Sequence, residues 1–444
     1  MVQIHKARKS AGNGAERVSG YCQGMKWAGM LFSSVVLGAV LMIFVYALPT
    51  EPMRRNVARS SGIFDYERIF PELVNSYAYT RLDNFTDSLM LGAAIYKGNE
   101  PLLERAMQNY HIDSQDLPPD LAMTNYANEV EQYDYYKVSY GRYWHGYLVP
   151  LKVLLLFFDY GDIRILNFFF QSYLLYYVIK MLFQKKQGKY IRAYLISIFV
   201  LNPLTTALSI QFSTVYYIIL LSCACLLRMY KEGEAESKKI NDLFFLTGIA
   251  TSYFDFLTYP LAGAGILLVL YLNLYGGLIT GKQYKSCIGK IILWCMGYGG
   301  MWSGKWLIGT LLTKTDFFRY VLEQGKIRTS VDGYTRLETL FKNLQVFFRW
   351  PFLLVCLMLF FYYIRKLQGE KQQMIFRKKR NWKDLWKRNR TRIFLYAIIS
   401  LLPAVWMCVM ANHSWVHYWF TYREFSISAF ALFSLAAYME KGTK

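Results

Sequence analysis

The chain has 444 residues, of which 54% are hydrophobic and 18% aromatic, and its formal net charge is +21. The apolar residues gather in runs of about 18 to 25, long enough for a helix to cross a hydrocarbon layer of about 30 Å. This pattern excludes a soluble globular domain. Because a spanning segment must satisfy its own backbone groups, we predict an all-α polytopic membrane protein.

The chain begins with a basic leader, residues 1–24, which contains Lys6, Arg8, Lys9 and Arg17. The first apolar run, 25–48, follows it. The run is longer than the apolar core of a signal peptide and has no clear small-residue cleavage site. We therefore predict a cytoplasmic leader and a first transmembrane helix that stays in the protein.

The next stretch, 49–142, is polar and holds 14 of the 30 acidic residues. Its apolar residues follow an amphipathic pattern, so we expect a folded, helical loop on the membrane surface. The run 146–158 is too short to cross comfortably and contains Pro150 and Lys152. It is expected to be an interfacial or re-entrant helix. We assign 49–160 to one extracytoplasmic loop.

The remaining bundle is assigned to 161–440, with a cytoplasmic tail at 441–444. Counting the first run, the sequence predicts about ten spans, at 25–48, 162–183, 192–210, 213–229, 241–257, 260–279, 287–311, 345–366, 393–411 and 425–440. Lysine and arginine gather in alternate short loops and most densely at 377–392. The positive-inside rule then places both termini in the cytoplasm, here of a bacterial plasma membrane.

The basic segment 377–392 is interpreted as a loop that touches anionic lipid, without a nucleic-acid partner. The sequence shows no P-loop, no dinucleotide-binding glycine motif and no obvious internal repeat. These absences argue against an ATP-driven pump and weaken a transporter interpretation.

In this topology the unusual polar residues converge on the outer side of the membrane, where ionisable groups at membrane depth indicate function. They occur in the stretches RLDNFTD, GRYWHG, SYFDFLTYP, GYGGMWSGKW and NHSWVHYWFTYRE. The candidates are Arg81, Asp83, Asp87, Arg142, His145, Asp255, Lys305, His413, His417, Tyr422 and Arg423.

Each candidate also has a structural explanation. Asp83 and Asp87 are four residues apart and share one helical face, which could simply be solvated. Asp255 could cap the next helix, and Lys305 could extend to the interface. His413 and His417 have the spacing of a zinc pair, but no third ligand or HExxH motif accompanies them. The metal site stays unassigned, and a divalent metal remains an open alternative.

The order of predicted spans and loops and these sequence stretches resemble those of the GT-C class of integral-membrane glycosyltransferases, in particular uncharacterised bacterial members. The resemblance lies in a first span, a long acidic outer loop and many spans joined by short loops. It implies a polyprenyl-phosphate sugar donor, a glycan or lipid-linked acceptor and an outward-facing active site. It also implies that an acidic residue of the first outer loop is the general base, which here is matched by Asp83 or Asp87.

The residue chemistry agrees with this interpretation. A carboxylate can take the proton of an acceptor hydroxyl, and cations can stabilise the leaving phosphate. For the phosphate we select Arg142, Lys305, Arg423 and His413. For the sugar or acceptor we select Arg81, His145, Asp255, His417 and Tyr422. Two alternatives stay open: a surface polysaccharide polymerase, and a non-enzymatic lipid or glycan flippase.

Overall fold

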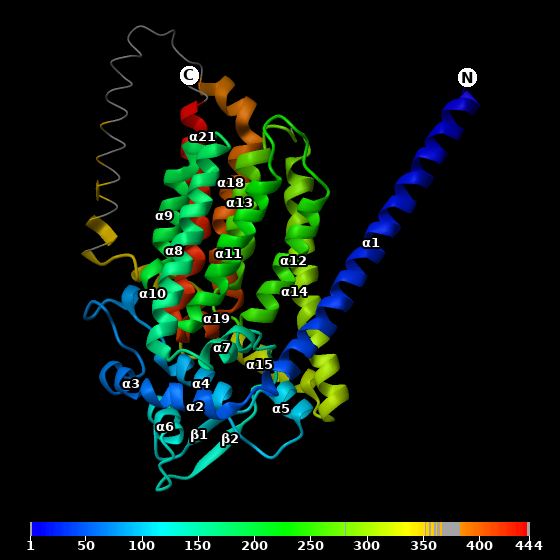
Figure 1. Cartoon of the computed structure of the whole chain (residues 1–444). Coiled ribbons are helices and arrows are strands. Elements are labelled where there is room, and N and C mark those ends of the chain that lie inside the picture. Colours follow the sequence, from blue (N-terminus) through cyan, green and yellow to red (C-terminus); the bar gives the residue numbers. More distant parts are fainter. Residues whose placement is uncertain are drawn as a thin grey trace.

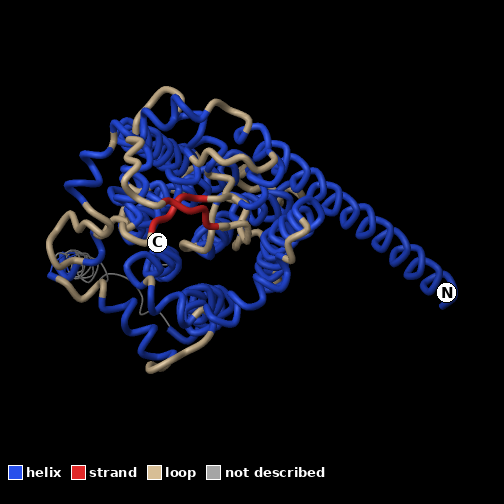
Figure 2. Tube along the Cα trace, turned by 90° about the horizontal axis from the view of Figure 1, so that it is seen from below, coloured by secondary structure: helices blue, strands red, loops and turns tan. Residues whose placement is uncertain are grey.

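A computed structural model describes residues 2–279, 281–350, 352–354, 357–358, 361, 365 and 382–441. It consists of a helix bundle and a smaller layer that covers one end of the bundle (Figure 1). Both labelled termini lie at the other end. Figure 2, which views the molecule from below, shows two short strands across the layer and α1 projecting to one side.

The bundle helices overlap predicted spans. They are α1 (Val2–Tyr46), α8 (Tyr160–Gln184), α9 (Ile191–Leu201), α10 (Pro203–Leu208), α11 (Ile210–Met229), α12 (Lys239–Phe254), α13 (Pro260–Tyr275), α14 (Gln283–Thr313), α18 (Trp382–Val409) and α21 (Ser426–Lys441). The short helix η2 (Gly188–Tyr190) precedes α9. Helices α9 and α10 together occupy one predicted span, 192–210, with a break at Asn202, whose φ is +56°.

Within the described residues, four helices are long and apolar enough to cross a membrane: Cys22–Tyr46, Tyr160–Gln184, Ile210–Met229 and Asn389–Val409. They indicate a membrane protein, while the finer count of ten spans stays a prediction. Part of the predicted span 345–366, residues 377–381 of the basic segment and the tail residues 442–444 lie outside the described residues.

The other bundle helices are shorter or more polar, and they pack closely against their neighbours. Helix α13 has 16 residues and is buried along nearly its whole length. Helices α12 and α14 meet at glycines. A Cβ atom on Gly248 would lie 2.2 Å from the Trp294 carbonyl oxygen, and one on Gly297 would lie 2.2 Å from that of Phe245. Glycine is therefore required for the two backbones to approach this closely.

The layer at the end of the bundle contains most of the predicted outer loop. Its helices are α2 (Thr50–Arg59), α3 (Ser61–Glu67), η1 (Ala78–Thr80), α4 (Asn84–Ile95), α5 (Leu102–Gln108) and α6 (Pro119–Ala127). Strands β1 (His111–Ser114) and β2 (Tyr135–Val138) pair antiparallel, with His111 opposite Val138. The prediction of a helical loop missed this pair, because four residues are too few to show an alternating pattern.

Short helices connect the layer to the bundle. Helix α7 (Leu148–Leu155) occupies the predicted interfacial run. Its eight residues rise only about 12 Å, so it does not cross a membrane. On the same end of the bundle lie α15 (Phe317–Thr329), α16 (Arg336–Gln345), α19 (Ala411–Val416), α20 (Tyr418–Thr421) and η3 (Tyr422–Phe425). Helix α16 begins with a capping box between Thr335 and Glu338.

Candidate functional site

The stretch NHSWVHYWFTYRE folds into the three consecutive short helices α19, α20 and η3. Helix α19 packs against α15 and α16, and η3 packs against α13. These turns therefore stand where the bundle meets the layer. A continuous spanning helix would direct its polar side chains into lipid, whereas the broken chain directs them toward neighbouring elements.

An arginine that the sequence reasoning missed contacts one of the two histidines of this stretch. Arg328 Nη1 lies 2.7 Å from His413 Nδ1, and His413 Nε2 lies 2.7 Å from the Leu257 carbonyl oxygen. Because the guanidinium donates and the carbonyl accepts, His413 carries its proton on Nε2. Burial, His417 and Arg328 together hold the pKa of His413 well below its usual value. His413 is therefore neutral.

Together with Arg328 and His413, His417 forms a polar cluster. Its ring centroid is 4.9 Å from that of His413 and 5.4 Å from that of Trp419. Burial, followed by the charge of Arg328, lowers the pKa of His417 to about 4. His417 Nδ1 and Arg328 Nε are buried and have no protein partner among the described residues. Unpaired polar atoms of this kind are costly, and they indicate a place for a polar ligand or water.

Asp83 lies near Trp419. It is 1% exposed and caps α4, accepting a hydrogen bond from the Thr86 backbone N–H at 3.0 Å. Burial raises the pKa of Asp83 to about 7, and the nearby Trp419 indole partly opposes this rise. Among the described residues, the Trp419 N–H does not reach hydrogen-bond geometry with any acceptor. Asp83 is thus a buried carboxyl group that titrates near neutral pH.

Asp87 has a different environment. Its Oδ2 accepts hydrogen bonds from the Tyr160 hydroxyl at 2.5 Å and the Ile210 backbone N–H at 2.9 Å. Its Oδ1 accepts one from the Gln211 backbone N–H at 3.0 Å. The carboxylate therefore caps the N-terminus of α11 from a neighbouring element. The two aspartates do not share a helical face, because Asp83 precedes α4 and Asp87 lies in its first turn.

Two further carboxylates act at the start of α13. Asp255 accepts hydrogen bonds from the backbone N–H groups of Leu257 at 2.9 Å and Thr258 at 3.0 Å. This cap holds the turn before α13, where Leu257 has a φ of +83°. Glu424, which was not selected from the sequence, accepts from the Leu261 N–H at 3.0 Å. Its Oε2 atom is buried and has no hydrogen-bond partner in the part of the chain that the structure describes.

Several predicted ligand groups are bonded to the protein itself. Arg423 is fully buried and donates to the carbonyl oxygens of Leu201 and Trp419 and to the Thr205 hydroxyl. Lys305 donates to the Met107 carbonyl oxygen at 2.8 Å. In this structure, both side chains hold neighbouring segments together and do not reach the cluster of Arg328, His413 and His417.

His145 and Tyr422 are also engaged internally. His145 Nε2 lies 2.8 Å from the Tyr140 carbonyl oxygen, and its Nδ1 lies 2.9 Å from the Tyr147 hydroxyl. Burial lowers the pKa of His145 to about 3, so the ring is neutral. Tyr422 donates to the Tyr79 carbonyl oxygen at 3.1 Å.

Two predicted arginines remain near the cluster. The Arg142 guanidinium carbon lies 4.3 Å from the Tyr140 ring centroid, and its Nη1 donates to the Tyr320 hydroxyl of α15. Arg81 pairs with Glu72 at 2.7 Å, and its guanidinium carbon lies 5.5 Å from the Trp419 ring centroid. Arg81 therefore positions Trp419 from the layer side.

An apolar groove of about 660 Å³ lies beside the cluster. It is lined by Leu401, Ala404, Val405, Cys408 and Val409 of α18, and by Thr329 and Arg336. Arg336 donates to the Thr329 carbonyl oxygen at 3.2 Å. Thr329 follows Arg328 directly in the chain, so the groove begins one residue from the polar cluster.

The residues described in the structure contain no group of three or more His, Cys, Asp or Glu side chains that could hold a metal ion. No family model, curated protein or solved structure matches the chain.

Proposed function

We propose that the chain is a membrane glycosyltransferase that moves a sugar from a polyprenyl-phosphate donor to a glycan or lipid-linked acceptor. One observation carries the proposal. The groove along α18 includes Thr329, the residue after Arg328, and Arg328 contacts His413, whose ring neighbours that of His417. The His417 ring in turn lies 5.4 Å from that of Trp419, a residue close enough to Asp83 to influence its pKa. Such a path suits a ligand with an apolar tail, an anionic head and a sugar.

Each part of the path suits one part of the donor. The apolar groove takes the isoprenoid chain, and Arg328 takes the phosphate, since a guanidinium can bind phosphate through two parallel hydrogen bonds. The unpaired His417 Nδ1 provides a further polar contact. Trp419 offers an aromatic face to the sugar. In this assignment Arg328 replaces Arg423 and Lys305 as the principal phosphate ligand, because those two side chains are already bonded to protein.

The reaction balances without another reactant. The acceptor hydroxyl oxygen forms a bond to the sugar carbon while Asp83 takes the hydroxyl proton. The bond between that carbon and the phosphate oxygen breaks, and the phosphate keeps the electron pair. Arg328 stabilises the negative charge that grows on the leaving oxygen. The carboxyl group must be ionised before the step, and a pKa of about 7 permits this near neutral pH.

The purified chain in lipid nanodiscs, supplied with polyprenyl-phosphate sugars and glycan acceptors, tests the proposal. Arg328→Ala is expected to weaken donor binding and slow transfer by about tenfold or more, and Arg328→Lys by less. The control is Arg319→Ala, on the same helix, because the Arg319 side chain is 80% exposed and should leave transfer unchanged. Wild-type protein that forms no glycosidic bond and releases no polyprenyl phosphate would refute the function.

The groove is tested separately. Ala404→Phe adds a ring inside the groove and is expected to weaken binding of long-chain donor. Ile398→Phe places the same ring on the exposed surface of α18, outside the groove, and is expected to have no effect. Equal donor binding by the two variants would show that the groove does not hold the donor chain.

A further inference from the structure

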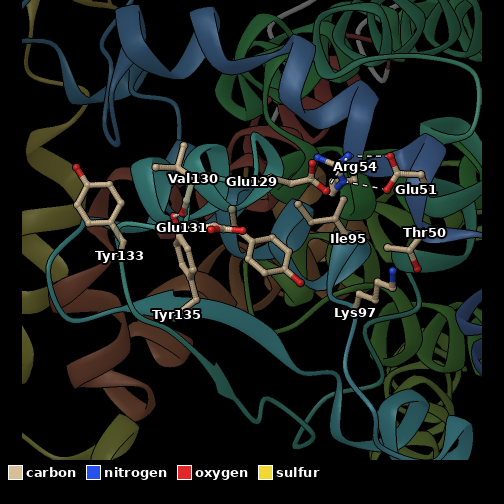
Figure 3. Close-up of a pocket in the computed structure, with 11 residues that line it drawn as sticks. Thr50, Glu51, Arg54, Ile95, Lys97, Glu129, Val130, Glu131, Tyr133 and Tyr135 are labelled. Carbon is tan, nitrogen blue, oxygen red and sulfur yellow. Dashed lines mark hydrogen bonds and ion pairs between the residues drawn. The ribbon is translucent and has the colours of Figure 1, made fainter.

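A second cavity, of about 370 Å³, lies in the layer. It is formed by the start of α2, the end of α4, helix α6 and the segment that leads into β2 (Figure 3). None of the residues of the polar cluster or the apolar groove lines it. Its volume lies within the range of small-ligand pockets.

The interior of the cavity is apolar and aromatic. Ile95, the last residue of α4, is fully buried and contributes to the lining. Tyr126 and Tyr135 meet edge to face, with ring centroids 5.5 Å apart. The Tyr135 hydroxyl donates to the Val130 carbonyl oxygen at 3.0 Å, which fixes this ring. A third aromatic residue, Tyr133, lies beside Glu131 in Figure 3.

The rim of the cavity is polar, and some of its side chains are held by ion pairs with one another. Arg54 forms ion pairs with Glu51 at 2.7 Å and Glu129 at 3.2 Å. Within the described structure, the side chains of Lys97 and Glu131 make no hydrogen bond or ion pair and are free to meet a ligand. Three glutamates against one arginine and one lysine give the lining a formal charge of −1. This charge disfavours a phosphate or carboxylate ligand.

We propose that this cavity is a second saccharide-binding site that takes an uncharged segment of a glycan acceptor. Tyrosine and isoleucine surfaces match the apolar face of a sugar ring, and the carboxylate and ammonium groups of the rim match its hydroxyls. The choice of a saccharide rests on the proposed function, while the cavity and its lining do not.

The distance of the cavity from Asp83 determines which part of the acceptor it can bind. Asp83 caps the start of α4, and Ile95 ends it after 12 residues. At 1.5 Å per residue these two ends lie about 18 Å apart. The cavity is therefore too far from Asp83 to hold the reacting hydroxyl, and it holds a remote part of the acceptor.

The test is saturation-transfer NMR on the full chain in a sugar-free amphipol, with maltotetraose, cellotetraose and chitotetraose as probes. Wild type is expected to bind at least one tetramer. Tyr133→Ala and Glu131→Gln should each weaken that binding about fivefold to tenfold. Tyr136→Ala is the matched control, because neighbouring residues of a strand point to opposite faces and Tyr136 does not line the cavity.

Two outcomes overturn the inference: no tetramer binds wild type, or both cavity variants bind like wild type. Asp83→Asn separates the inference from the proposed function. It should keep tetramer binding while losing transfer. If it keeps both, the saccharide site stands and Asp83 is not the base. If transfer is absent from wild type while the tetramer binds at this cavity, the proposed reaction fails alone.

Discussion

At the scale of single residues, Asp83 and Asp87 show how two carboxylates four positions apart acquire different roles. Both are buried, and burial is the main cause of the raised pKa of each. Asp87 receives three hydrogen bonds from Tyr160, Ile210 and Gln211. Asp83 accepts only the one from Thr86 in the described structure and lies beside the unpaired Trp419 N–H. Asp83 has fewer protein partners than Asp87, so its carboxyl oxygens are more available to bind a substrate.

This difference predicts the pH dependence of transfer. Burial raises the pKa of Asp83 to about 7, so the group is mostly neutral below that pH and ionised above it. A general base acts only when ionised, so the wild-type transfer rate should rise as the pH increases through about 7. Asp83→Asn should lower transfer by about 10²–10⁴-fold and remove this dependence. Transfer rates of the two proteins between pH 5 and 9 check this.

The raised pKa of Asp83 also affects stability: the transfer rate should rise with pH, whereas the stability of the folded state should fall. A carboxyl group whose folded pKa is above its unfolded value favours the folded state most at low pH. That contribution is lost as the pH rises from about 4 through about 7. Asparagine removes the titration and still serves as an N-cap. Thermal unfolding should therefore show Asp83→Asn gaining stability relative to wild type as the pH rises, and a constant difference would contradict the assignment.

At the scale of elements, Asp87 joins three of them. It belongs to α4, it receives the hydroxyl of Tyr160 from α8, and it caps α11 through the Ile210 and Gln211 N–H groups. One side chain thus fixes the layer to two helices that are long and apolar enough to span a membrane. This connection positions Asp83, which lies one turn before Asp87.

The capping role predicts a loss of stability for Asp87→Asn. An amide must direct its NH₂ group at one of the donors that now bond to the carboxylate, which leaves a buried donor unsatisfied. The expected loss is about 1–3 kcal/mol, measured by unfolding in detergent at pH 5, where the pKa of Asp87, raised to about 6 by burial, leaves little buried charge for the substitution to remove. Asp83→Asn is the matched control, since it keeps its cap and should not lose stability at this pH. An Asp87→Asn protein as stable as wild type would show that the cap is dispensable.

At the scale of the whole molecule, the sequence predicted a helical membrane protein because long apolar runs are a strong and local signal, while the count of ten spans stays a prediction. It predicted the stretches that lie at the bundle end, including Asp83, His413 and His417. It could not identify Arg328, since one arginine in a loop with several basic residues has no distinguishing pattern. Nor could it show that Arg423 and Lys305 are bonded to backbone carbonyls, because those contacts join segments far apart in the chain.

The arrangement of the molecule predicts which surfaces face each side of the membrane. The layer lies at one end of the bundle, and the two termini lie at the other (Figure 1). Residues 230–238 form the turn between α11 and α12 near this second end. Lys231 and Lys238 lie in the turn and Lys239 directly follows it, so the positive-inside rule predicts that the turn is in the cytoplasm. We therefore predict that the layer, which holds much of the acidic charge, lies outside together with the Asp83 site.

Cysteine labelling in intact cells tests this orientation, in a background in which the native cysteines are replaced by serine. Tyr66→Cys marks the layer, because Tyr66 is 90% exposed, and it should react with a membrane-impermeant maleimide added outside. Ala235→Cys marks the exposed turn before α12 and should react only after the cells are opened. Labelling of each variant in opened cells controls for its expression. Labelling of Ala235→Cys in intact cells, with Tyr66→Cys protected, would invert the orientation. It would place the Asp83 site in the cytoplasm, where an outward-facing transferase could not meet its acceptor.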